Sequence, residues 1–250
     1  MANKILITGF NGFVGTKLSQ TLVDKELVLL GRHKPEICPH PFYHYEFSAQ
    51  SRCDEAVKDV DVVIHCAARV HVMDDNSSDP LADFREVNTF GTLNLAKQAA
   101  AAGVKRFIFL SSIKVNGEST LVDKPFKYDD VAKLEDAYGI SKAEAEAGLQ
   151  QIAAETGMEV VIIRPPLVYG PGVKANFAAM LKLAQKNLPL PLGAIHNKRS
   201  LVALDNLVDL TVTCIDHPKA ANQTFLVSDD QDISTTELLK LMTCAAGKKP

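Results

Sequence analysis

The feature that most constrains this chain is the alternation of short apolar runs with helix-like segments over its first 165 residues. The apolar runs predict strands at 4–9, 26–32, 61–68, 104–112 and 158–166. The segments between them carry apolar residues at helical spacing, and the longest of these predict helices over 83–103 and 136–157. Strands that are apolar along their whole length belong to a parallel sheet buried on both faces. The pattern therefore predicts an α/β fold, a Rossmann doubly wound parallel sheet, over residues 1–165.

The regular alternation of apolar strands and helices ends after residue 165. A proline-rich stretch at 188–193 is unsuited to a central strand. Residues 199–217 read as a strand followed by a helix, and 234–248 read as a helix that starts with a capping box of Ser234 and Glu237. We expect residues 166–250 to form a second, smaller region, with the segment 200–217 packing back on the first.

Composition excludes several classes of function. The net charge is −3 and basic residues are scattered, so nothing predicts a nucleic-acid partner. No run of 18 apolar residues predicts a membrane span, and the N-terminus is too short and too interrupted for a signal peptide. Five cysteines without a CxxC pair suit reduced thiols and a cytoplasmic location. The histidines lack the spacing of a metal site, so we expect no metal.

A glycine-rich turn follows the first predicted strand. Gly9, Gly12 and Gly15 stand between that strand and a helix, where glycines permit a tight turn and close approach of a pyrophosphate. The start of the helix supplies N–H groups and a positive dipole for the anion. The alternative is an ordinary strand–helix turn. The predicted cofactor contacts here are the whole turn, namely Gly9, Phe10, Asn11, Gly12, Phe13, Val14 and Gly15.

The end of the second predicted strand bears on which dinucleotide binds. An NAD site places an acidic residue there to hold the ribose hydroxyl, whereas this chain has Gly31 followed by Arg32. The guanidinium of Arg32 suits a 2′-phosphate, so NADP(H) is favoured. The alternative is a solvated basic loop that leaves NAD possible.

Tyr138 and Lys142 stand four residues apart in a predicted helix and therefore share one face. A free tyrosine has a pKa of about 10, and a nearby ammonium stabilises the phenolate. Two serines end the fourth predicted strand, at the sheet edge where such folds place their sites. We expect Ser112, rather than Ser111, to hold a substrate oxygen beside Tyr138. The alternatives are an exposed tyrosine–lysine pair and serines that merely cap a strand end.

Together these residues resemble the extended short-chain dehydrogenase/reductases of the NAD-dependent epimerase/dehydratase family, which includes UDP-galactose 4-epimerases. The resemblance spans the chain and includes the segments IHCAA, VNTFGTLNL, FLSSIKVNG, YGISK and RPPLVYGPG. It implies that Tyr138, Lys142 and Ser112 are catalytic. It also implies that Ala67, Ala68, Ser111, Lys142 and Pro165 contact the cofactor, and that Ser112, Tyr138, Asn176 and Arg199 contact a UDP-sugar. Arg199 suits a diphosphate on physical grounds as well. Structural alternatives are a surface arginine and, for Asn176, a helix cap.

Two departures from the family pattern lie beside the predicted serine. Asn116 replaces the usual tyrosine, and Lys114 replaces a small or hydroxyl residue. A dehydratase of this family carries an acidic pair at the positions of Ile113 and Lys114, so the chain does not resemble a dehydratase. His65, inside an apolar strand, is expected to be a core histidine.

The resemblance leaves three readings of the function. With NADPH favoured, the first is reduction of a UDP-4-keto-6-deoxy-N-acetylhexosamine at C4 in surface-polysaccharide synthesis. The alternative is a UDP-hexose 4-epimerase with tightly bound NAD. A non-catalytic dinucleotide sensor is the second alternative. The family resemblance also implies a homodimer formed through the helices around 87–100 and 138–151.

Overall fold

The computed structural model describes residues 2–70, 78–121, 123–173, 175–186, 195 and 197–249, although side chains 175 and 176 are not described. The proline-rich stretch 188–193 lies outside these residues. Two compact units are present. The first contains Met1–Pro165 and Val208–Leu226, and the second contains Pro166–Leu207 and Val227–Pro250.

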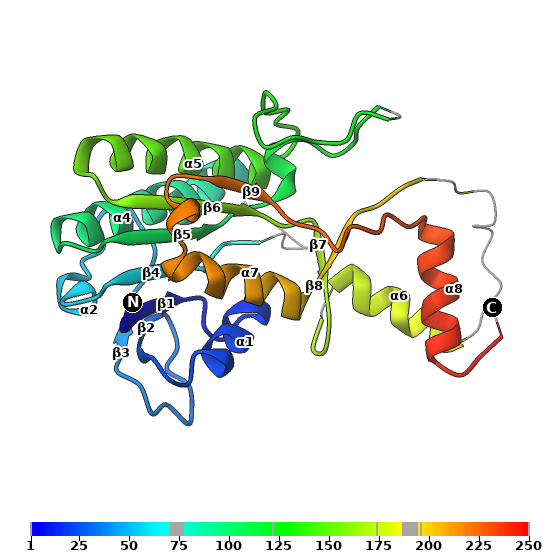
Figure 1. The fold of residues 1–250 in the computed structure, drawn as a ribbon, viewed down its shortest axis with the longest axis horizontal. Coiled ribbons are helices and arrows are strands. Elements are labelled where there is room, and N and C mark those ends of the chain that lie inside the picture. The colour runs from blue at the N-terminus through cyan, green and yellow to red at the C-terminus, as the bar shows by residue number, and fades with distance from the viewer. Residues whose placement is uncertain are drawn as a thin grey trace. The chain divides into compact units, whose positions relative to one another are not determined.

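A seven-stranded sheet forms the centre of the first unit (Figure 1), and every paired neighbour in it is parallel. Its order is β3-β2-β1-β4-β5-β6-β9. The strands are β1 (Lys4–Thr8), β2 (Glu26–Gly31), β3 (Phe42–His44), β4 (Val62–His65), β5 (Arg106–Leu110), β6 (Glu159–Arg164) and β9 (Thr224–Leu226). The order reverses between β1 and β4, so the carboxyl ends of these strands border the crevice that binds ligands in such folds. The predicted Rossmann sheet is confirmed.

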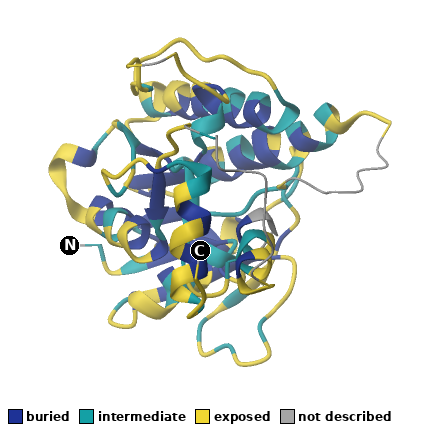
Figure 2. Cartoon of the chain, turned by 90° about the vertical axis from the view of Figure 1, so that its right-hand side faces the viewer, coloured by how far each residue is buried: buried dark blue, intermediate teal, exposed yellow. Residues whose placement is uncertain are grey.

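Helices cover both faces of this sheet (Figure 1). Their apolar sides join the strands in a core that includes Leu95, Phe107 and Leu149, all buried, while their outer sides are exposed (Figure 2). The helical elements of this unit are α1 (Phe13–Thr21), α2 (Asp54–Val57), α3 (Pro80–Phe84), η1 (Arg85–Gly91), α4 (Thr92–Ala101), η2 (Ile113–Val115), α5 (Ala137–Thr156), η3 (Pro218–Ala220) and, from Val208 on, α7 (Leu204–Asp216). Gly157 ends α5 in the left-handed conformation at φ 77°, as its position after the periodic pattern predicted.

The sequence prediction was wrong in two details. The expected single α-helix over 83–103 is divided, because residues 85–91 form π-helical turns between α3 and α4. Such a turn inserts a residue into the helix and is frequent at functional sites. Strand β3 was not expected, since it has only three residues and is half-buried to exposed, which leaves no periodic pattern to detect.

The second unit contains a two-stranded parallel sheet of β7 (Leu167–Tyr169) and β8 (Leu201–Ala203). Helices α6 (Ala175–Lys186) and α8 (Thr235–Ala245) share a core with Phe177, Leu201 and Met242 among its members. Ser234 caps α8, since its Oγ accepts a hydrogen bond from the N–H of Glu237 at 3.0 Å, as predicted.

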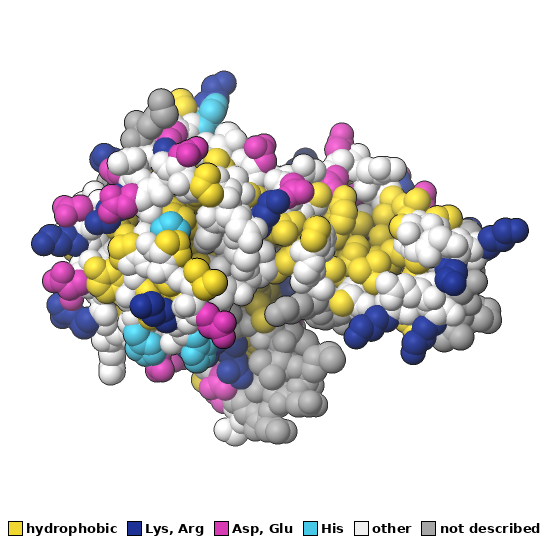
Figure 3. All heavy atoms as spheres, turned by 90° about the horizontal axis from the view of Figure 1, so that it is seen from below, with side chains coloured by type: hydrophobic (Ala, Val, Ile, Leu, Met, Phe, Trp, Pro, Cys, Tyr) yellow, Lys and Arg dark blue, Asp and Glu magenta, His cyan; other side chains and the backbone are white. Residues whose placement is uncertain are grey.

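Three further observations concern membrane-spanning helices, metal sites and the charge on the surface. No helix in the described part of the chain has the length and apolar character needed to cross a bilayer. Within the same residues, no cluster of three histidine, cysteine or acidic side chains is placed to bind a metal ion. Acidic and basic side chains are interspersed on the face shown in Figure 3.

Candidate active site

The glycine turn after β1 is a tight backbone cradle. Gly9 has a φ of 65°, and a Cβ at this position would lie 2.7 Å from the backbone nitrogen of Ala67. A Cβ on Gly15 would lie only 2.1 Å from the carbonyl oxygen of Gly9. Helix α1 begins after Gly12, and no described side chain caps it. The predicted dinucleotide fits this arrangement, because the turn admits no side chain at Gly9 or Gly15 and leaves the first N–H groups of α1 to an anion.

The end of β2 carries no acidic group. Gly31 is buried, and a Cβ there would lie 3.1 Å from the ring of Phe10, so even alanine would crowd it. Arg32 follows with an exposed side chain, and its carbonyl oxygen lies 3.0 Å from Nδ1 of His44. Phe10 therefore fills space beside β2, while Arg32 projects into solvent with its backbone tied to β3.

A buried polar chain joins β1, β4 and α4. Oγ1 of Thr8 accepts the N–H groups of Cys66 and Ala67, both at 3.1 Å, and lies 2.7 Å from Nδ1 of His65. With both lone pairs used, the Thr8 hydroxyl donates to Nδ1, so Nε2 carries the proton and donates to Thr92 at 2.9 Å. Burial, together with the charge of Lys142, lowers the pKa of His65 well below its usual value. His65 is thus a neutral core histidine that fixes the turn bearing Ala67, with Ala68 directly after it.

Helix α5 positions Tyr138 and Lys142 on one face. Lys142 is buried; its Nζ donates to the carbonyl oxygen of Leu110 at 2.8 Å and lies 4.4 Å from the ring centroid of Phe109 and 5.9 Å from that of Tyr138. The ammonium is therefore held at the carboxyl end of β5, facing the tyrosine ring. The Tyr138 ring meets Phe84 of α3 edge to face, with centroids 6.1 Å apart.

The electrostatics of this pair are set by burial. Burial lowers the pKa of Lys142 to about 8, although Cys66 and Glu146 oppose this shift. Burial also raises the pKa of Tyr138 to about 12, and the negative charge of Asp136 adds to it. At neutral pH the protein alone therefore holds Tyr138 as a phenol beside a mostly charged Lys142. A further positive charge nearby would lower the pKa of Tyr138 and favour the phenolate, which is the form that can accept a proton.

The structure distinguishes the two serines after β5. The Ser111 hydroxyl donates to the carboxylate of Glu146, and Ser111 is buried. Its backbone is then the part left to meet a cofactor. Ser112 is half-buried, and its Oγ accepts the N–H of Lys114 at 3.2 Å while its own proton stays available. Ser112 is therefore the serine that can donate to a substrate oxygen.

Beneath the serines lies a buried ion pair that the sequence reasoning missed. Glu146 of α5 pairs with Arg164 at the end of β6, with Nη2 and Oε2 2.5 Å apart. Arg164 also donates through Nη1 to Oδ1 of Asn116 at 2.9 Å, and Asn116 donates to the carbonyl oxygen of Lys127 at 2.7 Å. Asn116 is buried in this network, which explains its departure from the family pattern. An arginine inside an apolar strand and a glutamate four residues after Lys142 were the available signals.

Asn88 connects the π-helical turn to both sides of the site. It exchanges two hydrogen bonds with the backbone of Arg69, at 2.8 and 3.0 Å, and donates to Oγ of Ser141 at 3.1 Å. Ser141 in turn donates to the carbonyl oxygen of Tyr138. The wide turn of η1 thus brings one buried amide between the segment after β4 and the helix of the tyrosine.

The remaining predicted residues are distributed over the two units. Pro165 is the last residue of the first of the two segments that form the first unit, and its carbonyl oxygen accepts the N–H of Ile113 at 3.0 Å, beside Ser112. Arg199 belongs to the second unit, where its exposed segment pairs with the backbone of Ile233. Asn176 lies in the first turn of α6, and its side chain is outside the described residues.

Comparison with known proteins adds to this geometry. A UDP-glucose 4-epimerase of Vibrio cholerae is 54% identical over 253 residues, which cover 99% of this chain and 77% of that protein. The UDP-glucuronic acid 4-epimerase from Bacillus cereus, in complex with NAD, superposes with a TM-score of 0.85 at 20% identity, over 98% of this chain and 85% of the other.

A second solved structure, the UDP-glucose 4-epimerase of Thermotoga maritima with UDP-glucose, gives a TM-score of 0.82 at 21% identity, covering 99% and 84% of the two chains. The likeness to both solved structures is one of fold. The model of the NAD dependent epimerase/dehydratase family matches residues 5–228. By this match, and by the motifs that place a tyrosine and a lysine beside a glycine cradle, the chain belongs to the NAD dependent epimerase/dehydratase family.

Proposed function

We propose that this chain acts on UDP-sugars at C4 as a 4-epimerase. The observation that carries the proposal is the placement of Lys142, buried and charged, between the carboxyl end of β5 and the ring of Tyr138. A charged lysine in this position serves a tyrosine that must gain and lose a proton. Of the readings of the sequence, the identity of 54% to a UDP-glucose 4-epimerase favours the epimerase over the reductase.

The cofactor of this proposal is NAD, held by the cradle of Gly9, Gly12 and Gly15 and by the start of α1. A bound nicotinamide supplies the acceptor, and later the donor, of a hydride at the sugar C4. The adjoining backbone of Ala67 is fixed by Thr8, which holds this side of the cradle in place.

The chain's own residues move the proton and orient the sugar. Tyr138, as the phenolate, takes the proton of the sugar O4 hydroxyl and becomes the phenol. It returns that proton to the same oxygen after the sugar has presented its other face. Lys142 stabilises the phenolate that is present before and after this exchange, and Ser112 donates a hydrogen bond to O4. The raised pKa of Tyr138 means that proton removal depends on the charge of Lys142 together with that of an oxidised cofactor. Asn176 and Arg199 are proposed to hold the diphosphate.

A reductase of UDP-4-keto sugars is the second candidate, and one observation favours it. Gly31 leaves no acidic group at the end of β2, and Arg32 beside it is exposed and able to meet a 2′-phosphate. In this reading Tyr138 begins as the phenol and donates its proton to a keto oxygen, which suits its raised pKa.

Two measurements decide between the candidates. Nucleotide released by denaturing the purified protein is identified, and UDP-glucose is incubated with the protein to follow formation of UDP-galactose. Retained NAD⁺ and interconversion, reduced by about 10²-fold or more in Tyr138→Phe, support the epimerase. An empty protein that oxidises NADPH with a UDP-4-keto sugar supports the reductase. Dinucleotide binding without either reaction would support the non-catalytic dinucleotide sensor.

The homodimer remains a proposal as well. Helices α4 and α5 pack against each other, since a Cβ on Gly148 would lie 2.6 Å from the side chain of Leu93. Phe90, at the start of this helix pair, has 45% of its surface exposed. Sedimentation velocity of the wild type and of Phe90→Lys tests whether this face joins two copies.

A further inference from the structure

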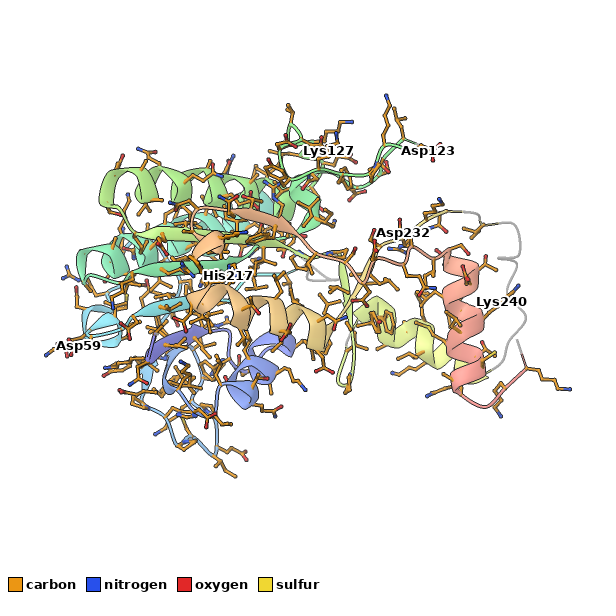
Figure 4. All side chains as sticks on the ribbon, in the orientation of Figure 1. Asp59, Asp123, Lys127, His217, Asp232 and Lys240 are labelled. Carbon is orange, nitrogen blue, oxygen red and sulfur yellow. The ribbon has the colours of Figure 1, made fainter. Side chains whose placement is uncertain are left out.

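The chain makes a long excursion between the two proposed hydroxyl groups of the site. Ser112 precedes η2 and Tyr138 lies in the first turn of α5, and residues 117–135 between them leave the edge of the sheet (Figure 1). Figure 4 labels Asp123 and Lys127 on this excursion. Its described residues form no helix or strand. A segment of this length does not by itself hold its two ends at a fixed separation.

An ion pair closes the base of the excursion. Nζ of Lys114, two residues after Ser112, contacts the carboxylate of Asp136, two residues before Tyr138. Asp136 also caps α5, because its Oδ1 accepts the N–H of Gly139 at 2.6 Å. The backbones of the two segments also lie close together, since a Cβ on Gly139 would lie 3.0 Å from the carbonyl oxygen of Lys114. The turn of the serine and the first turn of the tyrosine helix are therefore in direct contact.

The same pair sets the charge near the tyrosine. Asp136 is the acidic group whose charge adds to the raised pKa of Tyr138. Burial opposes the charge of Lys114, but hydrogen bonds to Asp136 and Glu118 outweigh it and raise its pKa, so Lys114 stays cationic. Lys114 thus lies directly against the acidic group that acts on the phenol, and its positive charge opposes part of that effect.

Other charged groups around Tyr138 are engaged in their own contacts. Lys142 of α5 faces the ring, and the groups from α3, η1 and the segment after β4 form ion pairs of their own. The pairs concerned are Arg69 with Asp83 and Arg85 with Glu144, and Cys66 is a neutral thiol because burial raises its pKa to about 12. Among the ion pairs of the described residues, Lys114–Asp136 joins the serine turn to the tyrosine helix.

We propose that the Lys114–Asp136 ion pair is a clasp that holds the hydroxyl groups of Ser112 and Tyr138 in register and offsets part of the charge of Asp136 near Tyr138. The proposal rests on the proton transfer assigned to Tyr138 under the proposed function. Both members of the clasp are positioning residues. Lys114 is therefore fixed by its partner, which gives a physical reason for a lysine at this departure from the family pattern.

The test is a double-mutant cycle of Lys114 and Asp136, in which the pH dependence of kcat is measured for each variant. Lys114→Met leaves Asp136 uncompensated, so the apparent pKa of the acid–base group should rise by about half a unit. Asp136→Asn keeps a capping oxygen for α5 and removes the acidic group near Tyr138, while Lys114 keeps its contact with Glu118 at 3.2 Å, so the apparent pKa should fall by about the same amount. The double variant should return close to the wild type. Lys114→Arg should restore the wild-type profile.

The controls separate the clasp from a structural defect and from the reaction itself. Lys124→Met removes an exposed lysine of the same excursion and should leave the profile unchanged. Equal shifts in one direction for Lys114→Met and Asp136→Asn, or no shifts, would overturn the clasp while leaving the proposed function intact. Should Lys114→Met fail to fold, Asp136→Asn alone decides, since its cap is retained.

If the wild type shows no turnover of any UDP-sugar, the proposed function fails and the clasp is read spectroscopically. The chain has five tyrosines and no tryptophan, so tyrosinate absorption at a fixed alkaline pH is measurable with NAD⁺ bound. Subtraction of the Tyr138→Phe signal isolates the one group. More tyrosinate in Asp136→Asn than in Lys114→Met supports the clasp, and equal amounts overturn it.

Discussion

Replacement of Glu146 by glutamine should destabilise the protein severely, although it changes only one functional group. The side chains of Glu146 and Arg164 are 5% and 9% exposed, and the carboxylate accepts hydrogen bonds from Arg164 and from the Ser111 hydroxyl. Glutamine keeps the volume and one oxygen, but it leaves the guanidinium of Arg164 buried without a counterion. Breaking a buried pair in this way costs about 3–5 kcal/mol.

The structure places the expected value near the lower end of that range. Arg164 keeps its hydrogen bonds to Oδ1 of Asn116 at 2.9 Å and to the carbonyl oxygen of Tyr128 at 3.3 Å after the change. We therefore expect a loss of about 3 kcal/mol, which corresponds to a fall in Tm of about 6–12 °C for a chain of this size. Scanning calorimetry, with the near-ultraviolet circular dichroism as a second probe, measures it.

The same helix offers a matched control. Glu144 lies two residues earlier and pairs with Arg85 at 2.6 Å, but 34% and 38% of these side chains are exposed. Solvent screens this pair, so Glu144→Gln should have the same Tm as the wild type. The variant Glu146→Met with Arg164→Met should lose less stability than the two single changes add up to, because neither charge is then left alone. If Glu144→Gln and Glu146→Gln melt at the same temperature, the argument from burial is wrong.

Three further predictions concern the cradle, the serines and the acid limb of stability. Gly15→Ala should weaken dinucleotide binding by about ten-fold or more in a fluorescence titration, because its Cβ would lie 2.1 Å from backbone of Gly9; unchanged affinity would contradict the cradle. Ser112→Ala should lower kcat by about 10²-fold, whereas Ser111→Ala should act mainly on Tm through its lost bond to Glu146; the reverse order would exchange their roles. The N–H groups of Asn3 and Lys4 and the ammonium of Lys105 lower the pKa of Asp61 to about 2. The stability from this carboxylate is present above its unfolded pKa of about 3.9 and disappears as pH falls through 2. The difference in Tm between wild type and Asp61→Asn should therefore shrink over that window, and a constant difference would refute the linkage.

Local sequence patterns predicted the tyrosine–lysine pair and the glycine turn. The spacing of Tyr138 and Lys142 placed both on one helix face, because that relation depends only on helical periodicity. The glycines of the cradle were equally readable, since a turn between a strand and a helix is a local structure. Strand β3 was not readable, because three half-exposed residues form a strand only through their pairing with β2.

The two serines mark the limit of such reasoning. The resemblance to the family favoured Ser112, but the reason for the difference is tertiary, namely the carboxylate of Glu146 beneath Ser111. Lys114 was an unexplained departure until its contact with Asp136, 22 residues away, became visible. Neither contact could be predicted from residue spacing. The sequence of a segment without helical or strand periodicity does not indicate which other segment it contacts.

The sequence by itself determined the alternation of strands and helices, the glycine cradle and the helix that carries Tyr138 and Lys142. Each of these follows from relations between residues within one turn or one element, where backbone geometry leaves few choices. Tertiary structure alone decided the sheet order, the burial of Lys142 against β5, and the ion pairs of Glu146 with Arg164 and of Lys114 with Asp136. These depend on segments that meet across long separations in sequence, and their strength comes from burial, which exists only once the whole core has packed.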